Sequence, residues 1–106
     1  MQEKIKGMIN FAIKARKFTI GENVILYSKN HKVKLALLAI DASESTKKKY
    51  RDKLNYYHVS YIEYGKKEDL ASLLNKNEIS ILAITDSNIA KQITKLIKED
   101  ETNGLQ

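Results

Sequence analysis

Apolar residues recur along this 106-residue chain in two rhythms that alternate from one end to the other. A spacing of three or four positions, as in Ile5, Ile9 and Ile13, is typical of one buried face of a helix. Short continuous or alternating apolar runs are typical of strands. The pattern predicts helices over about residues 5–13, 22–29, 47–58, 67–74 and 87–97, and strands over 18–20, 33–40, 59–64 and 79–84.

The alternation of helices and strands predicts the fold class α/β, because crossover helices have to cover the faces of the sheet that they connect. We expect a three-layer α-β-α sandwich with a mixed four-stranded sheet. The run from Val33 to Ile40 is almost entirely apolar, which predicts a strand buried on both faces. We see no repeat or linker, so residues 1–98 are expected to form one domain and residues 99–106 an acidic, disordered tail.

The charge of the chain is uneven. It has 19 basic and 13 acidic residues, a formal net charge of +6, and residues 1–34 alone carry that balance. This favours an anionic partner, with nucleic acid as the first candidate. The chain has no cysteine, which excludes disulfides and thiolate chemistry. The longest apolar run is too short to cross a membrane and no signal segment is recognisable, so we expect a cytoplasmic protein.

Candidate catalytic residues are few. His31 and His58 fall at predicted helix ends, where exposed or capping side chains are common. Ser43 precedes a predicted helix and fits an N-cap better than a nucleophile. Asp41 follows a buried strand, where a metal or phosphoacceptor site is an alternative, but the first strand lacks the acidic residues that such a site needs. We expect no enzymatic activity, no metal and no cofactor.

The segment around Gly21 is the most informative for binding. It joins a strand to a short helix, and amide groups at such a helix start attract phosphate. Asn23 carries both a donor and an acceptor, which suits recognition of a base edge. The pattern predicts an RNA-binding face, with an ordinary glycine-led helix start as the alternative. Basic residues flank the segment on both sides, namely Arg16, Lys17, Lys29, Lys32 and Lys34.

Six segments together resemble the ribosomal L-seven-Ae family, and most closely its bacterial YlxQ-type branch, over about residues 3–98. The resemblance implies the α-β-α sandwich, binding to structured RNA and association with ribosomes, without enzymatic activity or cofactor. Typical targets are kink turns, sharp bends in duplex RNA at a three-nucleotide bulge followed by sheared G·A pairs. The segments are residues 6–12, 16–18, 20–23, 37–43, 46–49 and 63–70.

The resemblance also implies roles for single residues. The family's turn glycine matches Gly21 and its base-reading asparagine matches Asn23, whereas a common glutamate and lysine are replaced by Val24 and Tyr27. Ile79 matches a position that packs under an unstacked nucleotide. The predicted RNA-binding residues are Arg16, Lys17, Gly21, Glu22, Asn23, Val24, Tyr27, Lys29, Ser43, Glu44, Lys47, Lys76, Asn77 and Ile79.

The two replacements favour altered or relaxed specificity, because phosphate contacts can survive the loss of base-reading side chains. The alternative is that the same fold serves as a protein-interaction module, bound to ribosomal or other proteins. Tyr27, Tyr56, Tyr57, Tyr61 and Tyr64 could then supply anchors, since tyrosine is enriched at interfaces. In either case we expect a monomer.

Overall fold

The predicted elements are present in the predicted order in the computed structural model, which describes residues 1–104. The boundaries are α1 (Glu3–Lys14), β1 (Phe18–Ile20), α2 (Asn23–Lys29), β2 (Leu35–Leu38), α3 (Glu44–Tyr56), β3 (Tyr61–Glu63), α4 (Lys67–Ser72), β4 (Ile81–Ile84) and α5 (Ser87–Gly104). The α/β class and the mixed four-stranded sheet of the sequence analysis are thereby confirmed.

The sheet has the strand order β1-β4-β2-β3. Strand β4 runs antiparallel to both of its neighbours, β1 and β2, whereas β2 and β3 run parallel. The C-terminal ends of β1, β2 and β3 therefore meet the N-terminal end of β4 at one end of the sheet. The loops that follow the first three strands and the loop that precedes β4 lie together there.

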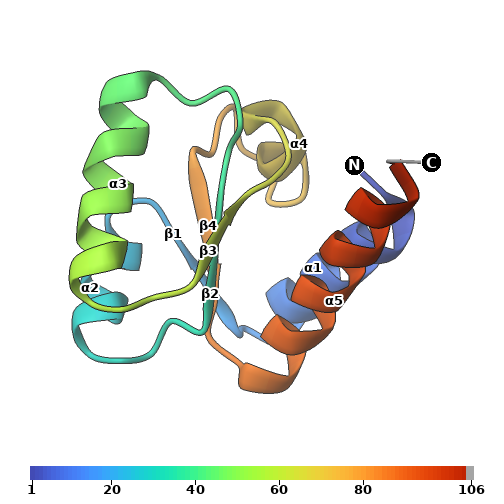
Figure 1. Ribbon diagram of the computed structural model, residues 1–106, viewed down its shortest axis with the longest axis horizontal. Helices are drawn as coiled ribbons and strands as arrows, with labels where there is room; N and C mark the ends of the chain where they lie inside the picture. Colours follow the sequence, from blue (N-terminus) through green and yellow to red (C-terminus); the bar gives the residue numbers. More distant parts are fainter. Residues whose placement is uncertain (105–106) are drawn as a thin grey trace.

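Helices cover both faces of the sheet, with α1 and α5 on one side and α2 and α3 on the other (Figure 1). The first core joins Ile5 and Ile93 to Leu37, and the second joins Leu54 to Leu38. All residues of β2 and β4 are buried, because successive side chains point to opposite cores. This explains the nearly unbroken apolar runs in the sequence.

Most boundaries differ from the predicted ones by a few residues, and two of the differences change the expected surface. Strand β2 ends at Leu38 rather than Ile40, and the Ile40 side chain is 48% exposed. Helix α5 continues to Gly104, beyond the predicted domain boundary at residue 98. The last turns carry Glu99, Asp100 and Glu101, and a helix can continue through such polar residues in solvent without a core to cover. The remainder of the predicted tail, residues 105–106, lies outside the described residues.

Several helices end with a residue in the left-handed conformation that is not glycine. After α3, His58 has φ +58°, and its N–H donates to the carbonyl of Asn55, while the N–H of Val59 donates to that of Leu54. This is the Schellman arrangement. Arg16 after α1 and His31 after α2 repeat it. Both histidines are therefore exposed residues at helix ends, as predicted.

We expect His58→Gly to raise the free energy of unfolding by about 1 kcal/mol, because glycine adopts the left-handed conformation without steric cost. The midpoint of thermal unfolding should rise by about 3–5 °C. Lys53→Gly, at an exposed position within α3, is the matched control and should lower stability by about 1 kcal/mol. Urea titration of both variants measures whether the free energy of unfolding rises or falls. A less stable His58→Gly variant would contradict the left-handed conformation assigned to residue 58.

Candidate nucleic-acid interface

Segments from four parts of the chain meet at the end of the sheet where β1, β2 and β3 finish. The N–H of Gly21 donates to the carbonyl of Ile81 at 3.4 Å, which joins the end of β1 to the start of β4. The N–H of Ala39 donates to the carbonyl of Ser80 at 2.8 Å. We call this end the Gly21 rim and define it as residues 21–23, 40–44, 65–67 and 75–80.

Further hydrogen bonds hold α4 to the Gly21 rim. The N–H of Ile40 donates to the carbonyl of Gly65 at 2.8 Å. The carboxylate of Asp41 accepts the N–H of Lys67 at 2.8 Å, at the first residue of α4. Asp41 therefore has a structural role, because it fixes the loop after β2 against the start of α4.

The Gly21–Asn23 segment presents one free polar side chain. Gly21 has φ +61°, which favours glycine, and α2 begins two residues later. The amide side chain of Asn23 is exposed and makes no hydrogen bond within residues 1–101. The Glu22 carboxylate accepts a hydrogen bond from Lys49 of α3, and this bond raises the pKa of the Lys49 ammonium. Asn23 is thus available for a ligand, whereas Glu22 is engaged.

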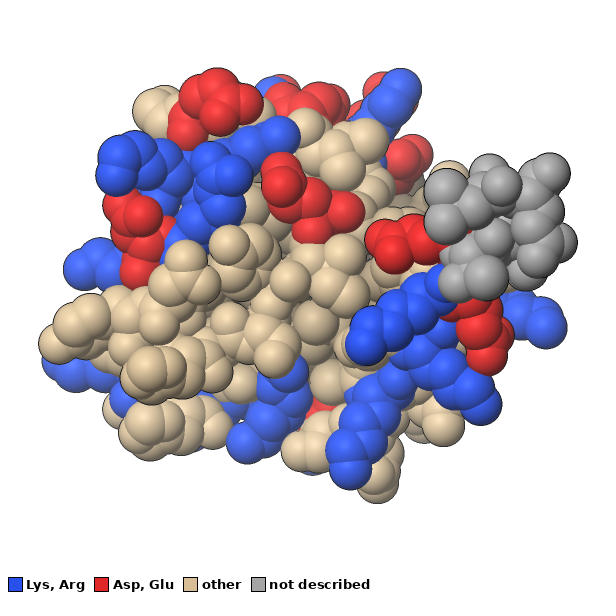
Figure 2. All heavy atoms as spheres, in the orientation of Figure 1, with Lys and Arg blue, Asp and Glu red and all other residues tan. Residues whose placement is uncertain are grey.

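Several lysines near the Gly21 rim are paired with carboxylates, whereas Lys66 and Lys76 of the rim itself are exposed and form no ion pair within residues 1–101. Lys47, whose side chain is 14% exposed, lies 3.0 Å from Glu63, and Lys67 lies 3.4 Å from Glu78. Acidic and basic side chains alternate over this part of the surface, as Figure 2 shows above α3. The rim therefore offers hydrogen-bonding groups and shape rather than a surplus of positive charge.

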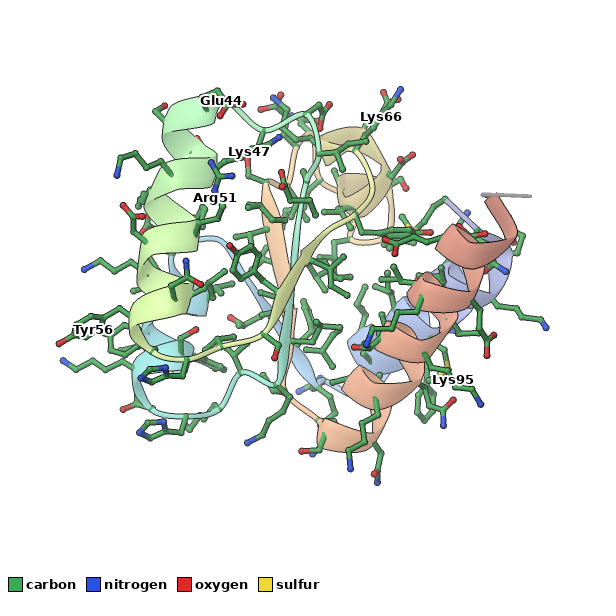
Figure 3. All side chains as sticks on the ribbon, in the orientation of Figure 1. Glu44, Lys47, Arg51, Tyr56, Lys66 and Lys95 are labelled. Carbon is green, nitrogen blue, oxygen red and sulfur yellow. The ribbon has the colours of Figure 1, made fainter. Side chains whose placement is uncertain are left out.

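Residues at the start of α3 shape the second loop of the rim. The Ser43 hydroxyl accepts the N–H of Thr46 at 3.2 Å, which confirms the predicted N-cap. Glu44 is exposed, and its carboxylate lies 3.9 Å from Arg51, one of the α3 residues labelled in Figure 3. Lys76 and Asn77 are exposed in the loop before β4.

Two of the predicted contact residues are in the core. Val24 is fully buried between α2 and the sheet, and Ile79 is only 5% exposed and packs in the α1–α5 core. Their side chains do not reach the surface, because Val24 in α2 and Ile79 in the loop before β4 both face the cores. Ile40, which sequence reasoning assigned to a buried strand, instead places an apolar side chain on the rim.

The predicted single face is divided by the structure. Arg16 and Lys17 lie at the start of β1 and Lys29 at the C-terminal end of α2, at the opposite end of the sheet from the Gly21 rim. Tyr27 is half-buried on that side, beneath the ammonium of Lys32 at 5.5 Å from the ring centre. The division arises because β1 and α2 each run along the sheet from one end to the other.

The predicted set of RNA-binding residues omits four residues of that second end. Lys32, Lys34, His31 and Thr85 line a shallow depression of about 370 Å³ together with Arg16, Lys17 and Tyr27. The only signal in the sequence was the high density of basic residues before β1 and β2. Within residues 1–104 no helix is both long and apolar enough to cross a membrane.

The structure defines the chain as an α-β-α sandwich with a glycine-led polar rim at one end of its mixed sheet. Residues 3–95 match the ribosomal protein L7Ae/L30e/S12e/Gadd45 family, and the chain belongs to that family.

Two similar proteins carry the name RNA-binding protein YlxQ. The protein from Enterococcus faecium is 33% identical over 92% of this chain and 94% of its own length. The protein from Bacillus subtilis (strain 168) is 34% identical over 85% of this chain and 91% of its own. A solved structure of a protein with unknown function from Bacillus halodurans C has a TM-score of 0.84 and 28% identity, covering 92% of this chain and 99% of that one.

We expect Val24→Glu to lower the free energy of unfolding by about 2 kcal/mol or more, because a carboxylate would be forced into an apolar core. Asn23→Glu is the matched control. Asn23 is next to Val24 but exposed at the start of α2, where a negative charge costs little. Urea unfolding of both variants measures the difference. Equal stability of the two would show that position 24 can face solvent.

Proposed function

We propose that this protein binds structured RNA through the Gly21 rim and does so without catalysing a reaction. The observation that carries the proposal is the convergence of chain segments far apart in sequence on one end of the sheet, held by the Gly21–Ile81 and Ala39–Ser80 hydrogen bonds. Three of these segments, at residues 21–23, 43–44 and 76–79, contain residues that the family resemblance assigns to RNA. The name of the two YlxQ relatives supports the same activity.

Asn23 is the side chain that we assign to base recognition. Its amide is exposed and unengaged, and it can both donate to and accept from the edge of a base. Ile40 adds an exposed apolar surface on the same rim, on which an unstacked base could rest. Ser43 and Asn77 supply further hydrogen-bonding groups from the loops on either side.

The specificity that we propose is related to kink-turn recognition but relaxed. Val24 is buried and Tyr27 lies toward the other end of α2, so neither replaces a carboxylate or an ammonium at the rim. The acidic side chains of the rim also pair with nearby lysines. Recognition then depends on a few hydrogen bonds and on shape, and we propose ribosomal or kink-turn-like RNA as the target of a cytoplasmic monomer.

Asn23→Ala should erode the preference for a kink turn over the same RNA with its G·A pairs replaced by Watson–Crick pairs. The expected loss of discrimination lies between about 5-fold and about 100-fold, the range for one good base contact. Fluorescence anisotropy with both RNAs measures the ratio of dissociation constants. Asn55→Ala, at an exposed position on α3, is the matched control and should leave the ratio unchanged.

Equal affinity of the unaltered protein for the two RNAs would contradict kink-turn recognition. An unchanged ratio in Asn23→Ala would contradict the role of Asn23.

A second candidate function, a protein-interaction module, is favoured by one observation. Tyr56 is 74% exposed at the end of α3, with its ring 4.9 Å from that of Tyr57, and Leu26 of α2 is 53% exposed. An apolar contact through these residues would depend little on salt, whereas RNA affinity falls log-linearly with salt. Affinity measured across a series of KCl concentrations should therefore fall steeply if RNA is the partner.

A further inference from the structure

The positive charge of this protein is concentrated at the end of the sheet opposite the Gly21 rim. We call this region the basic end and define it by Arg16, Lys17, Lys29, Lys32 and Lys34. The segments that meet there are residues 14–17, 29–34, 57–60 and 85–88, and Asp86 is their only acidic residue. The Asp86 carboxylate accepts the N–H of Ile89 at 2.9 Å, at the start of α5.

The basic end lacks the ion pairs that neutralise the rim. Within the described part of the chain, the carboxylates that pair with lysine or arginine belong to Glu22, Glu44, Asp52, Glu63 and Glu78, and none of them pairs with a residue of the basic end. Lys32 instead lies over the Tyr27 ring, and the Lys34 ammonium donates to the carbonyl of His31 at 3.2 Å. These contacts position the ammonium groups without cancelling their charge.

The backbone holds the basic end in a fixed shape. The N–H of Thr85 donates to the carbonyl of Lys17 at 2.9 Å, and the N–H of Lys34 donates to that of Ile84 at 2.8 Å. The starts of β1 and β2 are thereby joined to the end of β4. Together with the left-handed helix ends at Arg16 and His31, these bonds set the walls of the depression.

The positive surface continues from the depression along α5. Lys34 also lines a larger groove of about 1060 Å³ between the start of β2, the edge strand β3 and α5, where Lys91 and Lys95 lie one helical turn apart. Figure 2 shows blue side chains following α5 beside an uncharged hollow, and Figure 3 labels Lys95 on that helix. Basic side chains therefore lie both at the depression and along α5, rather than in a single anion pocket.

The basic end is too far from the Gly21 rim to serve the same RNA contact. The extended run from Lys34 to Ala39, which contains β2, spans about 17 Å at ~3.3 Å per residue. The screening length at physiological salt is about 8 Å, so charges at one end contribute little to a phosphate held at the other. An RNA segment bound at the rim leaves the basic end open.

We propose that the basic end binds the phosphate backbone of a second RNA segment, so that the protein bridges two segments, one at each end of its sheet. The inference rests on the proposed RNA binding at the rim. The charged groups at the basic end are lysine and arginine side chains, which we expect to hold the phosphate backbone without reading sequence. The second segment is therefore ordinary duplex RNA, of any sequence, near the structured RNA that the rim recognises.

The first test measures binding to a labelled RNA duplex of about 20 base pairs without a kink turn. The triple variant Arg16→Gln, Lys17→Gln, Lys32→Gln should weaken the affinity by about tenfold or more at roughly physiological salt. The slope of log affinity against log salt concentration should decrease in magnitude by about 2 to 3, because each removed charge releases about one counterion fewer on binding. Circular dichroism and the thermal midpoint establish that the variant is folded.

The matched control removes the same charge elsewhere. Lys4→Gln, Lys48→Gln, Lys53→Gln changes exposed lysines of α1 and α3 that belong neither to the rim nor to the basic end. We expect this variant to bind the duplex as the unaltered protein does. An equal loss in both triple variants would show that only net charge matters and would overturn the proposal, as would an unaffected basic-end variant.

The second test measures bridging. Kink-turn RNA is immobilised, the protein is captured on it, and recruitment of the labelled duplex is recorded. Asn23→Ala should reduce capture of the protein, and the basic-end variant should reduce recruitment of the duplex only. Capture without recruitment would overturn the bridging proposal and leave the proposed function intact. Absence of capture, with duplex binding that still needs the basic end, would overturn the rim function and with it the bridging, and would leave only backbone binding at the basic end.

Discussion

The structure depends on the burial of two central strands on both faces. Strands β2 and β4 lie between two separate cores. Each core also contains side chains from the helices that cover its face of the sheet. Each fully buried leucine or isoleucine contributes about 1.5–3 kcal/mol relative to exposure, so these strands dominate the favourable side of folding. The antiparallel setting of β4 among the other three then decides which loops share an end of the sheet.

That single reversal of direction produces a protein with two unlike ends. One end gathers the turn at Gly21, the Asp41 loop, the start of α4 and the loop before β4, and Lys67 and Glu78 of this end form an ion pair. The other gathers helix C-termini and strand starts, with lysine and arginine that have no carboxylate partners within the described residues. The groups that we propose for hydrogen-bond recognition and those that we propose for backbone attraction thus lie at opposite ends of the sheet.

The separation changes the meaning of the net charge. A balance of +6 in the first 34 residues suggests a single basic RNA face when it is seen along the chain. The structure divides the same residues, because β1 and α2 traverse the sheet and carry Arg16 and Lys29 away from Asn23. Ile40 and Val24 show the same effect on a smaller scale. Ile40 is exposed on the rim, whereas Val24 is fully buried.

The sequence by itself determined the helices, the strands, the doubly buried runs of β2 and β4, the Ser43 cap and the exposed histidines at helix ends. These features depend on spacing within a few residues, which periodicity and local hydrogen bonding report directly. Strand order, the pairing of Lys47 with Glu63 and of Lys49 with Glu22, and the two-ended distribution of charge were decided only by the tertiary structure. They depend on which distant segments become neighbours, and local spacing carries no information about that choice.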